Sequence, residues 1–260
     1  MWNRAEAGTG TGKPLVLLHG IGMSHKAWSP IIQQLSKSRR VIAFDVAGFG
    51  DSPSLGASVQ PTIHNLVSAL ERELKTIGIH EPVDIVGNSM GGWMALEAAR
   101  VGLASSVVAI SPAGLWDESP AHVKMVFFSL RNAIKFMPNI SRQMMGFALF
   151  RELLLAIPIG TGGRNISRKD ALNSIDDFSK ATDFDRTFAN VGRFIGGKDI
   201  QVPLTIAFGT KDWLLRKKDC QYKSELPNHV NWLEPKDWGH VPMWKDPQGV
   251  ADLILKNISA

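Results

Sequence analysis

The sequence predicts an α/β fold in which a mostly parallel central sheet is covered by helices on both faces. Short, continuous apolar runs alternate along the chain with longer segments of helical periodicity. Continuous apolar strands of this kind are typical of a parallel sheet that is buried on both sides. A chain of 260 residues is long enough to form one large domain with a sizeable core. Ligands of such sheets bind at the carboxyl ends of the strands, so functional residues are expected directly after the apolar runs.

The elements follow one another in a regular order. The expected strands are the six apolar runs at 14–18, 41–44, 83–86, 107–110, 204–208 and 230–233. Five segments of helical periodicity lie between and after them, at 27–37, 61–77, 90–101, 217–225 and 246–257. Because helices separate the strands, the connections are long enough to return the chain to the same end of the sheet, as parallel strands require.

The interval between 110 and 204 breaks this rhythm. It contains no convincing strand, only segments of helical character that are interrupted by three prolines. An interval of this length is too long for a simple crossover. We therefore expect a helical cap at 114–198, inserted into a core that consists of 1–113 and 199–260.

The composition excludes several classes of protein. With 44% hydrophobic and 20% charged residues, the chain is neither disordered nor fibrous. Its single cysteine rules out a disulfide framework and a cysteine-based zinc site, and we expect no metal and no cofactor. The chain has no apolar leader and no stretch of roughly 18 apolar residues, so we expect a cytoplasmic protein without a membrane span. No nucleic-acid-binding motif is present, which leaves a small-molecule substrate as the expected partner and the oligomeric state, monomer or dimer, open.

The net charge of +5 is concentrated in the expected cap. Residues 119–168 contain seven Lys and Arg residues and a single acidic one, so the rest of the chain is close to neutral. The same segment is rich in Met and Phe. An apolar lining beneath a basic outer surface would suit an apolar substrate that carries a negative charge, with Arg131 and Arg142 as the cations to test. The alternative is that these cations are only the solvated faces of amphipathic helices.

The strongest motif is Gly87-Asn88-Ser89-Met90-Gly91-Gly92, which matches G-x-S-x-G directly after an expected strand and directly before an expected helix. A turn this sharp strains the backbone of the serine, and glycines on either side avoid side-chain clashes. Ser89 would then be exposed at the top of the sheet, at a helix N-terminus whose dipole favours developing negative charge. The alternative is that Ser89 only caps the helix.

A serine nucleophile needs a base, and the base needs an orienting carboxylate. His240 stands out among the seven histidines because it lies in the loop between the last expected strand and the last expected helix. Asp212 lies just past the fifth apolar run, at the same edge of the sheet. The order Ser89, Asp212, His240 predicts a triad of nucleophile, orienting acid and base. The weaker candidates for the acid are Asp199, Asp219 and Asp237.

A tetrahedral intermediate also needs an oxyanion hole. The segment His19-Gly20-Ile21-Gly22 follows the first apolar run and is similar to the H-G-x-G turn that supplies one. The expected donors are the backbone N–H groups of Ile21 and of Met90, the residue after the nucleophile. His19 is expected to hold this turn by hydrogen bonds. The glycine-rich segment at 45–52 is expected to shape a turn without taking part in the chemistry.

Together these segments resemble the α/β-hydrolase superfamily over nearly the whole length of the chain. The resemblance rests on the oxyanion turn, the segment at 45–52, the serine motif, Gly209-Thr210-Lys211-Asp212 and Gly239-His240, in that order. It implies the α/β-hydrolase fold, with a Ser89–His240–Asp212 triad and a helical cap inserted after the sixth strand. Haloalkane dehalogenases and epoxide hydrolases carry an aspartate at the nucleophile position, so the serine disfavours both branches.

The resemblance implies a carboxylesterase that acts on small, largely apolar substrates. Asn88 before Ser89 is similar to the meta-cleavage-product hydrolases, which cut carbon–carbon bonds in vinylogous diketones. Those enzymes tend to carry a tryptophan after the catalytic histidine, where Val241 stands in this chain. A C–C hydrolase is therefore the first alternative, and a slow-turnover small-molecule receptor of the same fold is the second. The residues expected to contact the substrate are Gly20, Asn88, Phe127, Met144 and Val241.

Overall fold

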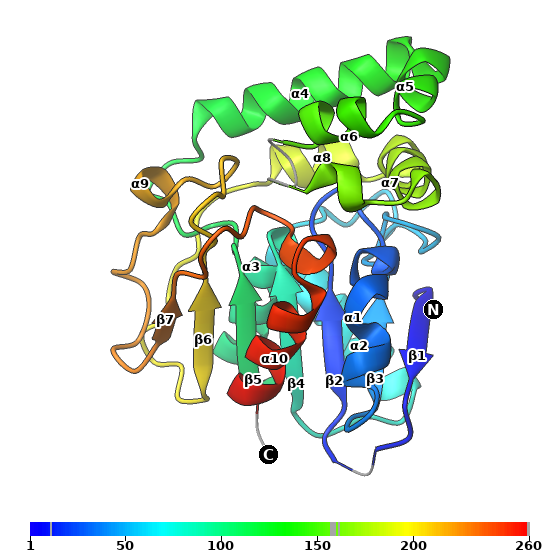
Figure 1. Cartoon of the computed structure of the whole chain (residues 1–260). Helices are drawn as coiled ribbons and strands as arrows, with labels where there is room; N and C mark the ends of the chain where they lie inside the picture. Colours follow the sequence, from blue (N-terminus) through cyan, green and yellow to red (C-terminus); the bar gives the residue numbers. More distant parts are fainter. Residues whose placement is uncertain (11, 157–159, 161, 259–260) are drawn as a thin grey trace.

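The central sheet has seven strands in the order β1-β3-β2-β4-β5-β6-β7 (Figure 1). The structure is a computed structural model that describes residues 1–10, 12–156, 160 and 162–258. All neighbouring strands are parallel except β1 and β3, which are antiparallel. The strands are β1 (Arg4–Ala7), β2 (Leu15–Leu18), β3 (Val41–Phe44), β4 (Val83–Asn88), β5 (Ala104–Ile110), β6 (Leu204–Ala207) and β7 (Asn231–Leu233).

The six expected apolar runs form β2 to β7, so the mostly parallel α/β sheet is confirmed. Strand β1 is not among the predicted strands. Its sequence, Arg4-Ala5-Glu6-Ala7, contains no large apolar residue, because it lies at the edge of the sheet and its side chains are only partly buried or exposed. An edge strand that buries so little leaves no apolar run in the sequence.

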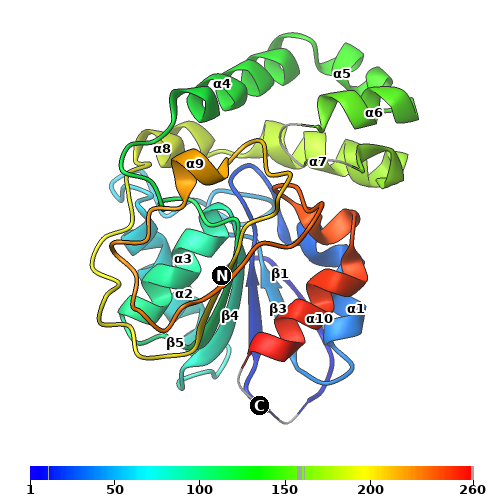
Figure 2. The same ribbon diagram turned by 60° about the vertical axis from the view of Figure 1, so that its left-hand side comes forward.

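Helices cover both faces of the sheet (Figure 2). Helices α2 (Ile63–Thr76) and α3 (Met90–Arg100) pack together on one face. The other face carries α1 (Ser29–Leu35) and α10 (Pro247–Asn257), which also contact each other. Within the described residues, no helix has both the length and the apolar character of a membrane-spanning segment.

Two expected helices differ from the prediction. The segment at 27–37 is divided into a 3-10 turn, η1 (His25–Trp28), and α1. The segment at 217–225 contains only one helical turn, α9 (Lys217–Cys220). The helix ends there because the Tyr222 N–H donates to the Leu115 carbonyl at 3.0 Å instead of continuing the helical pattern.

The segment between β5 and β6 contains five helices, which lie above the carboxyl ends of the strands (Figure 1). They are α4 (Ala121–Phe136), α5 (Pro138–Met144), α6 (Ala148–Leu154), α7 (Arg168–Lys180) and α8 (Phe184–Ala189), with a 3-10 turn η2 (Gly163–Asn165) before α7. No strand occurs in the described part of this segment, as expected. The insertion is expected after the sixth strand but follows the fifth, β5. Only one strand, β1, precedes the first apolar run, so the fourth run is the fifth strand of the sheet. A separate cap domain at 114–198 stays a prediction.

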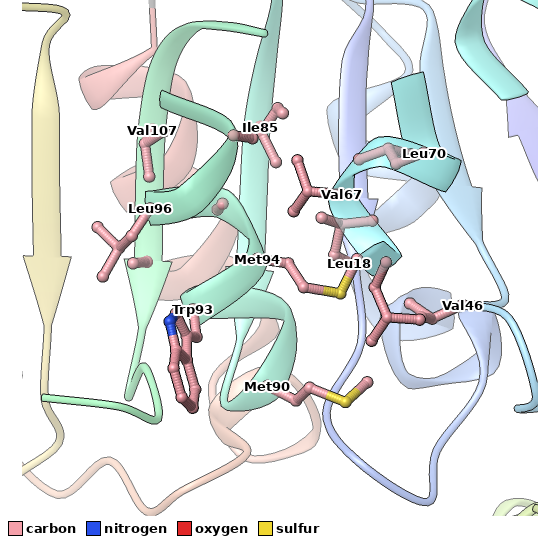
Figure 3. Packing of buried hydrophobic residues seen from close by; sticks show 14 of the residues in the cluster. Leu18, Val46, Val67, Leu70, Ile85, Met90, Trp93, Met94, Leu96 and Val107 are labelled. Carbon is pink, nitrogen blue, oxygen red and sulfur yellow. The ribbon is translucent and has the colours of Figure 1, made fainter. Parts of the chain in front are cut away.

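Strand residues alternate between two apolar cores, one on each face of the sheet. Leu18 of β2 belongs to the core beneath α2 and α3, whereas its neighbour Leu17 belongs to the core beneath α1 and α10. Figure 3 shows the first core, in which Met90 and Trp93 extend from the first turn of α3. Burying a side chain of this size contributes about 1.5–3 kcal/mol relative to leaving it exposed. The helix that begins at the serine motif is therefore anchored at its first turn.

Candidate active site

Ser89 stands between β4 and α3 in a backbone conformation that residues other than glycine rarely adopt. Its φ is 56° and its ψ is −116°, a strain that costs on the order of 1–3 kcal/mol. The flanking glycines make the turn possible. A Cβ on Gly87 would lie 2.0 Å from the Gly91 carbonyl oxygen, and a Cβ on Gly91 would lie 2.1 Å from the Leu18 carbonyl oxygen. The close passage of three backbone segments explains the G-x-S-x-G pattern.

The hydroxyl of Ser89 does not cap α3. Ser89 occupies the N-cap position, but its side chain makes no capping hydrogen bond. Its backbone is fixed instead: the N–H donates to Ile110 O at 3.0 Å, and the carbonyl accepts from Trp93 N–H at 3.1 Å. The alternative that Ser89 is only a helix cap is therefore wrong, and its side chain lies in the wall of a cavity.

His240 and Asp212 form a buried hydrogen-bonded pair. Nδ1 of His240 lies 2.9 Å from Oδ2 of Asp212. The N–H groups of Leu214 and Leu215 donate to the other carboxylate oxygen at 3.0 and 2.8 Å. Because an ionised carboxylate can only accept, Nδ1 carries the proton and Nε2 is the basic nitrogen of the ring. His240 lines the same cavity as Ser89.

The loops after β6 and β7 are joined so that the acid meets the base. The Lys211 N–H donates to the Trp238 carbonyl at 2.8 Å. A Cβ on Gly209 would lie 2.2 Å from the same oxygen, so this approach requires glycine. Asp237, a weaker candidate for the orienting acid, forms an ion pair with Lys211 at 2.7 Å. The structure thus places Asp212, and not Asp237, against the imidazole.

His19 holds the turn after β2, as expected. The side chain is fully buried, Nδ1 lies 2.8 Å from Gly20 O, and the Val46 N–H donates to Nε2 at 2.9 Å. Since Nε2 accepts, Nδ1 donates to the Gly20 carbonyl. Burial lowers the pKa of His19 and keeps the ring neutral in this arrangement.

Two backbone N–H groups flank Ser89. In a trans peptide the C=O and N–H point in opposite directions, so the His19 contact to Gly20 O turns the Ile21 N–H away from the histidine. A Cβ on Gly20 would lie 3.2 Å from the Ser89 Cβ, so this peptide passes beside the serine. Within the described residues, neither the Ile21 N–H nor the Met90 N–H donates a hydrogen bond. Both predicted oxyanion donors are therefore available next to Ser89.

The glycine-rich turn after β3 is organised around the carboxylate of Asp45. This carboxylate accepts hydrogen bonds from His25 Nδ1 at 2.8 Å, Asn3 Nδ2 at 2.7 Å and the Asp51 N–H at 2.9 Å. Burial alone would raise the pKa of Asp45, but these donors hold it well below its usual value. The segment is turn architecture, as predicted.

A cavity of about 1010 Å³, counted to its open mouth, lies between Ser89, His240 and the helices above the sheet. Most of its lining side chains are apolar, and they come from the turn after β2, from α4 and from α7. Four of the residues expected to contact a substrate line it: Gly20, Asn88, Phe127 and Val241. Met144 does not, because the next residue, Met145, turns into the cavity at the end of α5 and is 5% exposed.

Asn88 has a second contact besides its place in the cavity wall. Its Nδ2 donates to the His240 carbonyl at 2.8 Å and to the Ile110 carbonyl at 3.1 Å. The side chain therefore ties the loop that carries the base to the end of β5. Its Oδ1 is buried and has no hydrogen-bond partner among the described residues.

A second, smaller cavity, of about 520 Å³ counted to its open mouth, meets the first at Ser89. The two share Ile21, Ser89, Phe127 and Leu214 in their walls. Leu214 is absent from the sequence prediction, although its position two residues after Asp212 is a signal that could have found it. Among the described lining residues of both cavities there is no Lys, Arg, Asp or Glu.

Arg131 and Arg142, the two cations to test for an anionic substrate, do not line the cavities. Arg131 donates to the Phe178 carbonyl at 2.8 Å and lies over the Phe184 ring at 5.0 Å. Arg142 pairs with Asp176. These contacts join α4 to α7 and α8, and α5 to α7, and neither arginine lines the two cavities, which favours the alternative that the cap cations do not bind the substrate. Their charge is used to hold the inserted helices together.

The apolar residues of the inserted helices do not all line the cavity. Phe127 and Met145 are buried, but Met125, Phe128 and Phe136 are 64%, 69% and 72% exposed. Helix α4 turns one apolar face, which includes Phe127, toward the cavity and a second apolar face toward solvent. The outer surface of these helices thus carries exposed apolar side chains beside its cations.

The single cysteine is not an alternative nucleophile. Cys220 is buried, and this burial raises the pKa of its thiol to about 12. The reactive thiolate is therefore not populated near neutral pH. In the ranges that the structure describes, no group of three or more His, Cys, Asp or Glu side chains could hold a metal ion.

The comparisons with known proteins agree with the fold. The family model for the alpha/beta hydrolase fold matches residues 13–247, and the chain belongs to this family. Over 200 residues, 74% of this chain and 93% of the relative, the chain is 28% identical to epoxide hydrolase EphH of Mycobacterium tuberculosis.

Two solved structures illustrate the shared fold. The carboxylesterase CesB from Bacillus subtilis is similar with a TM-score of 0.74 and 20% identity, covering 98% of this chain and 86% of that one. A meta-cleavage product hydrolase from Pseudomonas fluorescens IP01 has a TM-score of 0.73 and 20% identity, covering 98% and 93%. The family therefore includes esterase, epoxide hydrolase and C–C hydrolase relatives, and the chain is similar to all three.

Proposed function

We propose that this protein is a serine carboxylesterase that cleaves esters of small, largely apolar substrates. One observation carries the proposal: the strained Ser89 shares a cavity with His240, whose Nδ1 is held by the Asp212 carboxylate at 2.9 Å. Ser89 is then the nucleophile, His240 the base and Asp212 the orienting acid. The helices between β5 and β6 act as a cap over this site.

The reaction follows from these positions. Nε2 of His240 takes the proton from Ser89 Oγ as the oxygen attacks the ester carbonyl carbon. The carbonyl oxygen becomes an oxyanion, which accepts hydrogen bonds from the N–H groups of Ile21 and Met90. The intermediate collapses to an acyl-enzyme, and His240 gives its proton to the departing alcohol. A water molecule, deprotonated by His240, then attacks the acyl carbon and releases the carboxylic acid and free Ser89.

The cavities favour an ester over the substrates of meta-cleavage-product hydrolases. Those substrates carry a carboxylate, whereas the described lining residues of both cavities include no cationic Lys or Arg. Burying an unpaired carboxylate among apolar side chains is unfavourable. Two apolar chambers that meet at Ser89 instead match the two sides of an ester, the acyl group and the alcohol.

Ester hydrolysis by Ser89→Ala tests the proposal. We expect kcat for short p-nitrophenyl esters to fall by roughly 10⁴-fold or more, because the hydroxyl that forms the acyl-enzyme is lost. Ser141→Ala is the matched control, since Ser141 lines the same cavity without any predicted role in the chemistry. Wild-type activity in Ser89→Ala, with the fold intact, would refute the assignment.

A substrate panel separates the proposal from its two alternatives. We expect faster turnover of neutral esters than of a vinylogous diketone acid. Preferential cleavage of the diketone would identify a C–C hydrolase instead. A single turnover that leaves a long-lived adduct would identify a receptor, because an esterase releases its acyl group repeatedly.

A further inference from the structure

The inserted helices expose an unusual amount of apolar surface. Of the sixteen large hydrophobic residues that are exposed in the described part of the molecule, ten lie between Met125 and Leu154. The six most exposed of these ten, which define the outer cap surface, are Met125, Phe128, Phe136, Phe147, Leu149 and Leu153. Each is at least 62% exposed. Scattered apolar residues are normal on a protein surface, but a concentration of this kind marks an interaction site.

This surface lies on the side of the molecule away from the sheet. Figures 1 and 2 place α4, α5 and α6 in the layer farthest from the sheet, with α7 and α8 between that layer and the core. On α4, Phe127, Leu130 and Ile134 line the cavity, while Met125, Phe128 and Phe136 are exposed. A helix that is apolar on both faces is normally covered on both faces. The second face of α4 therefore requires a partner.

Cations accompany the outer cap surface. Lys124 precedes Met125, and the Lys135 ammonium lies 5.8 Å from the centre of the Phe136 ring. Neither lysine forms an ion pair with any residue that the structure describes. Arg168 lies near Gly146, where a Cβ on the glycine would be 3.7 Å from Nε. The acidic residue of this region, Glu152, forms an ion pair with Arg164 at 3.6 Å.

We propose that the outer cap surface docks on an anionic lipid bilayer. A bilayer of this kind offers both properties that the surface needs, an apolar interior for Phe128, Phe147 and Leu153 and negative headgroups for the lysines. Lysine stems can lie along the acyl chains while their ammonium groups reach the headgroups. A second copy of this chain is a poorer match, because a two-fold contact would place the same cations opposite one another.

The outer cap surface is continuous with the cavity. Leu154 lines the cavity and is also 39% exposed, directly after Leu153 of the outer cap surface. An apolar ester dissolved in the bilayer could therefore pass into the cavity without crossing water. This route rests on the proposed esterase function, whereas docking on the bilayer does not.

Sedimentation of the 260-residue chain with vesicles tests the docking. We expect it to bind vesicles of equal parts phosphatidylcholine and phosphatidylglycerol. Combining Phe128→Ser, Phe147→Ser and Leu153→Ser should weaken this binding by about 30-fold or more, because three apolar side chains no longer enter the bilayer. The matched control combines Val59→Ser and Ile195→Ser, which are exposed apolar residues outside the outer cap surface, and should bind like the wild type.

A second set of variants tests the electrostatic contribution of the two lysines to vesicle binding. Lys124→Gln and Lys135→Gln should each weaken binding to the anionic vesicles about five-fold, and pure phosphatidylcholine vesicles should bind much less protein. Ser89→Ala should bind vesicles like the wild type, so a failure of the esterase proposal stays distinguishable from a failure of docking. No binding to anionic vesicles, equal binding by the triple-serine variant, or a dimer in solution that this variant abolishes would overturn the proposal.

Discussion

At the carboxyl ends of β4, β6 and β7, buried polar groups have protein partners, whereas the outer cap surface leaves large apolar groups in contact with solvent. The Asp212 carboxylate has three hydrogen-bond partners, His240 Nδ1 and the N–H groups of Leu214 and Leu215, all within 3.0 Å. On the outer cap surface, Phe136 is 72% exposed. In the first region the polar groups are satisfied by hydrogen bonds within the chain. In the second region the apolar side chains have no neighbour within the described part of the chain that covers them. This contrast separates the residues proposed to perform chemistry from those proposed to meet a partner.

Replacing the orienting acid should give the largest change in the catalytic region. In Asp212→Asn the amide no longer favours a protonated Nδ1 on His240, so the base is held in the wrong tautomer. We expect kcat for a p-nitrophenyl ester to fall by about 10⁴-fold while the protein stays folded. Asp237→Asn is the control, since Asp237 pairs with Lys211 outside the site. A similar loss of kcat in both variants would contradict the assignment.

Removing the Asn88 side chain, which links the serine motif to the loop that carries His240, should have an intermediate effect on kcat. Asn88→Ala leaves the buried carbonyl of His240 without its donor, whereas the carbonyl of Ile110 keeps the Ser89 N–H. An unpaired buried polar group costs about 1–3 kcal/mol, which urea unfolding can measure. Because the His240 loop also loses its anchor, kcat should fall more than KM rises. An effect on stability alone would show that Asn88 has no positioning role.

The turn around Asp45 predicts a pH dependence of stability. The folded pKa of Asp45 is lowered, so its contribution is fully present above the ordinary value of about 3.9 and is lost as the pH falls below it. We expect Asp45→Asn to reduce the free energy of unfolding by about 1–3 kcal/mol at pH 7. The difference from the wild type should shrink as the pH falls below about 4. A difference that is constant with pH would exclude this origin.

The smallest effect is expected from the outer cap surface on soluble substrates. The combined Phe128→Ser, Phe147→Ser and Leu153→Ser variant leaves the residues that line the cavity in place. Its kcat for a soluble p-nitrophenyl ester should stay within about two-fold of the wild type, because exposed substitutions rarely change stability by more than about 0.5 kcal/mol. A large loss of soluble activity would mean that these side chains support the active site and are not a separate docking surface.

The sequence predicts the candidate site at the carboxyl ends of the strands better than it predicts the inserted helices, for physical reasons. Gly87, Gly91 and Gly209 each allow a backbone approach that no other residue permits, so the motifs carry the geometry of the turns with them. The apolar runs predict β2 to β7 because both faces of those strands are buried. The edge strand β1 leaves no such trace. The roles of Ser89, His240 and Asp212 remain predictions, which the geometry supports.

In the inserted helices, the sequence pattern does not predict which apolar side chains are buried and which are exposed to solvent. Phe127 and Phe128 are neighbours in the sequence, yet Phe127 is buried and Phe128 is 69% exposed. The choice of Met144 over Met145 fails for the same reason, since a shift of one residue on a helix turns a side chain by about 100°. The sequence leaves open whether Arg131 and Arg142 bind a substrate, because charge alone does not reveal their contacts with neighbouring helices.

The most direct test of the central assignment is to trap the nucleophile. A fluorophosphonate reacts with an activated serine and forms a stable covalent adduct, which mass spectrometry of the intact protein and its peptides can locate. We predict one adduct per chain on the peptide that contains Ser89, absent in Ser89→Ala and formed much more slowly in Asp212→Asn. An adduct on another serine, or no adduct in a preparation that hydrolyses esters, would contradict the account.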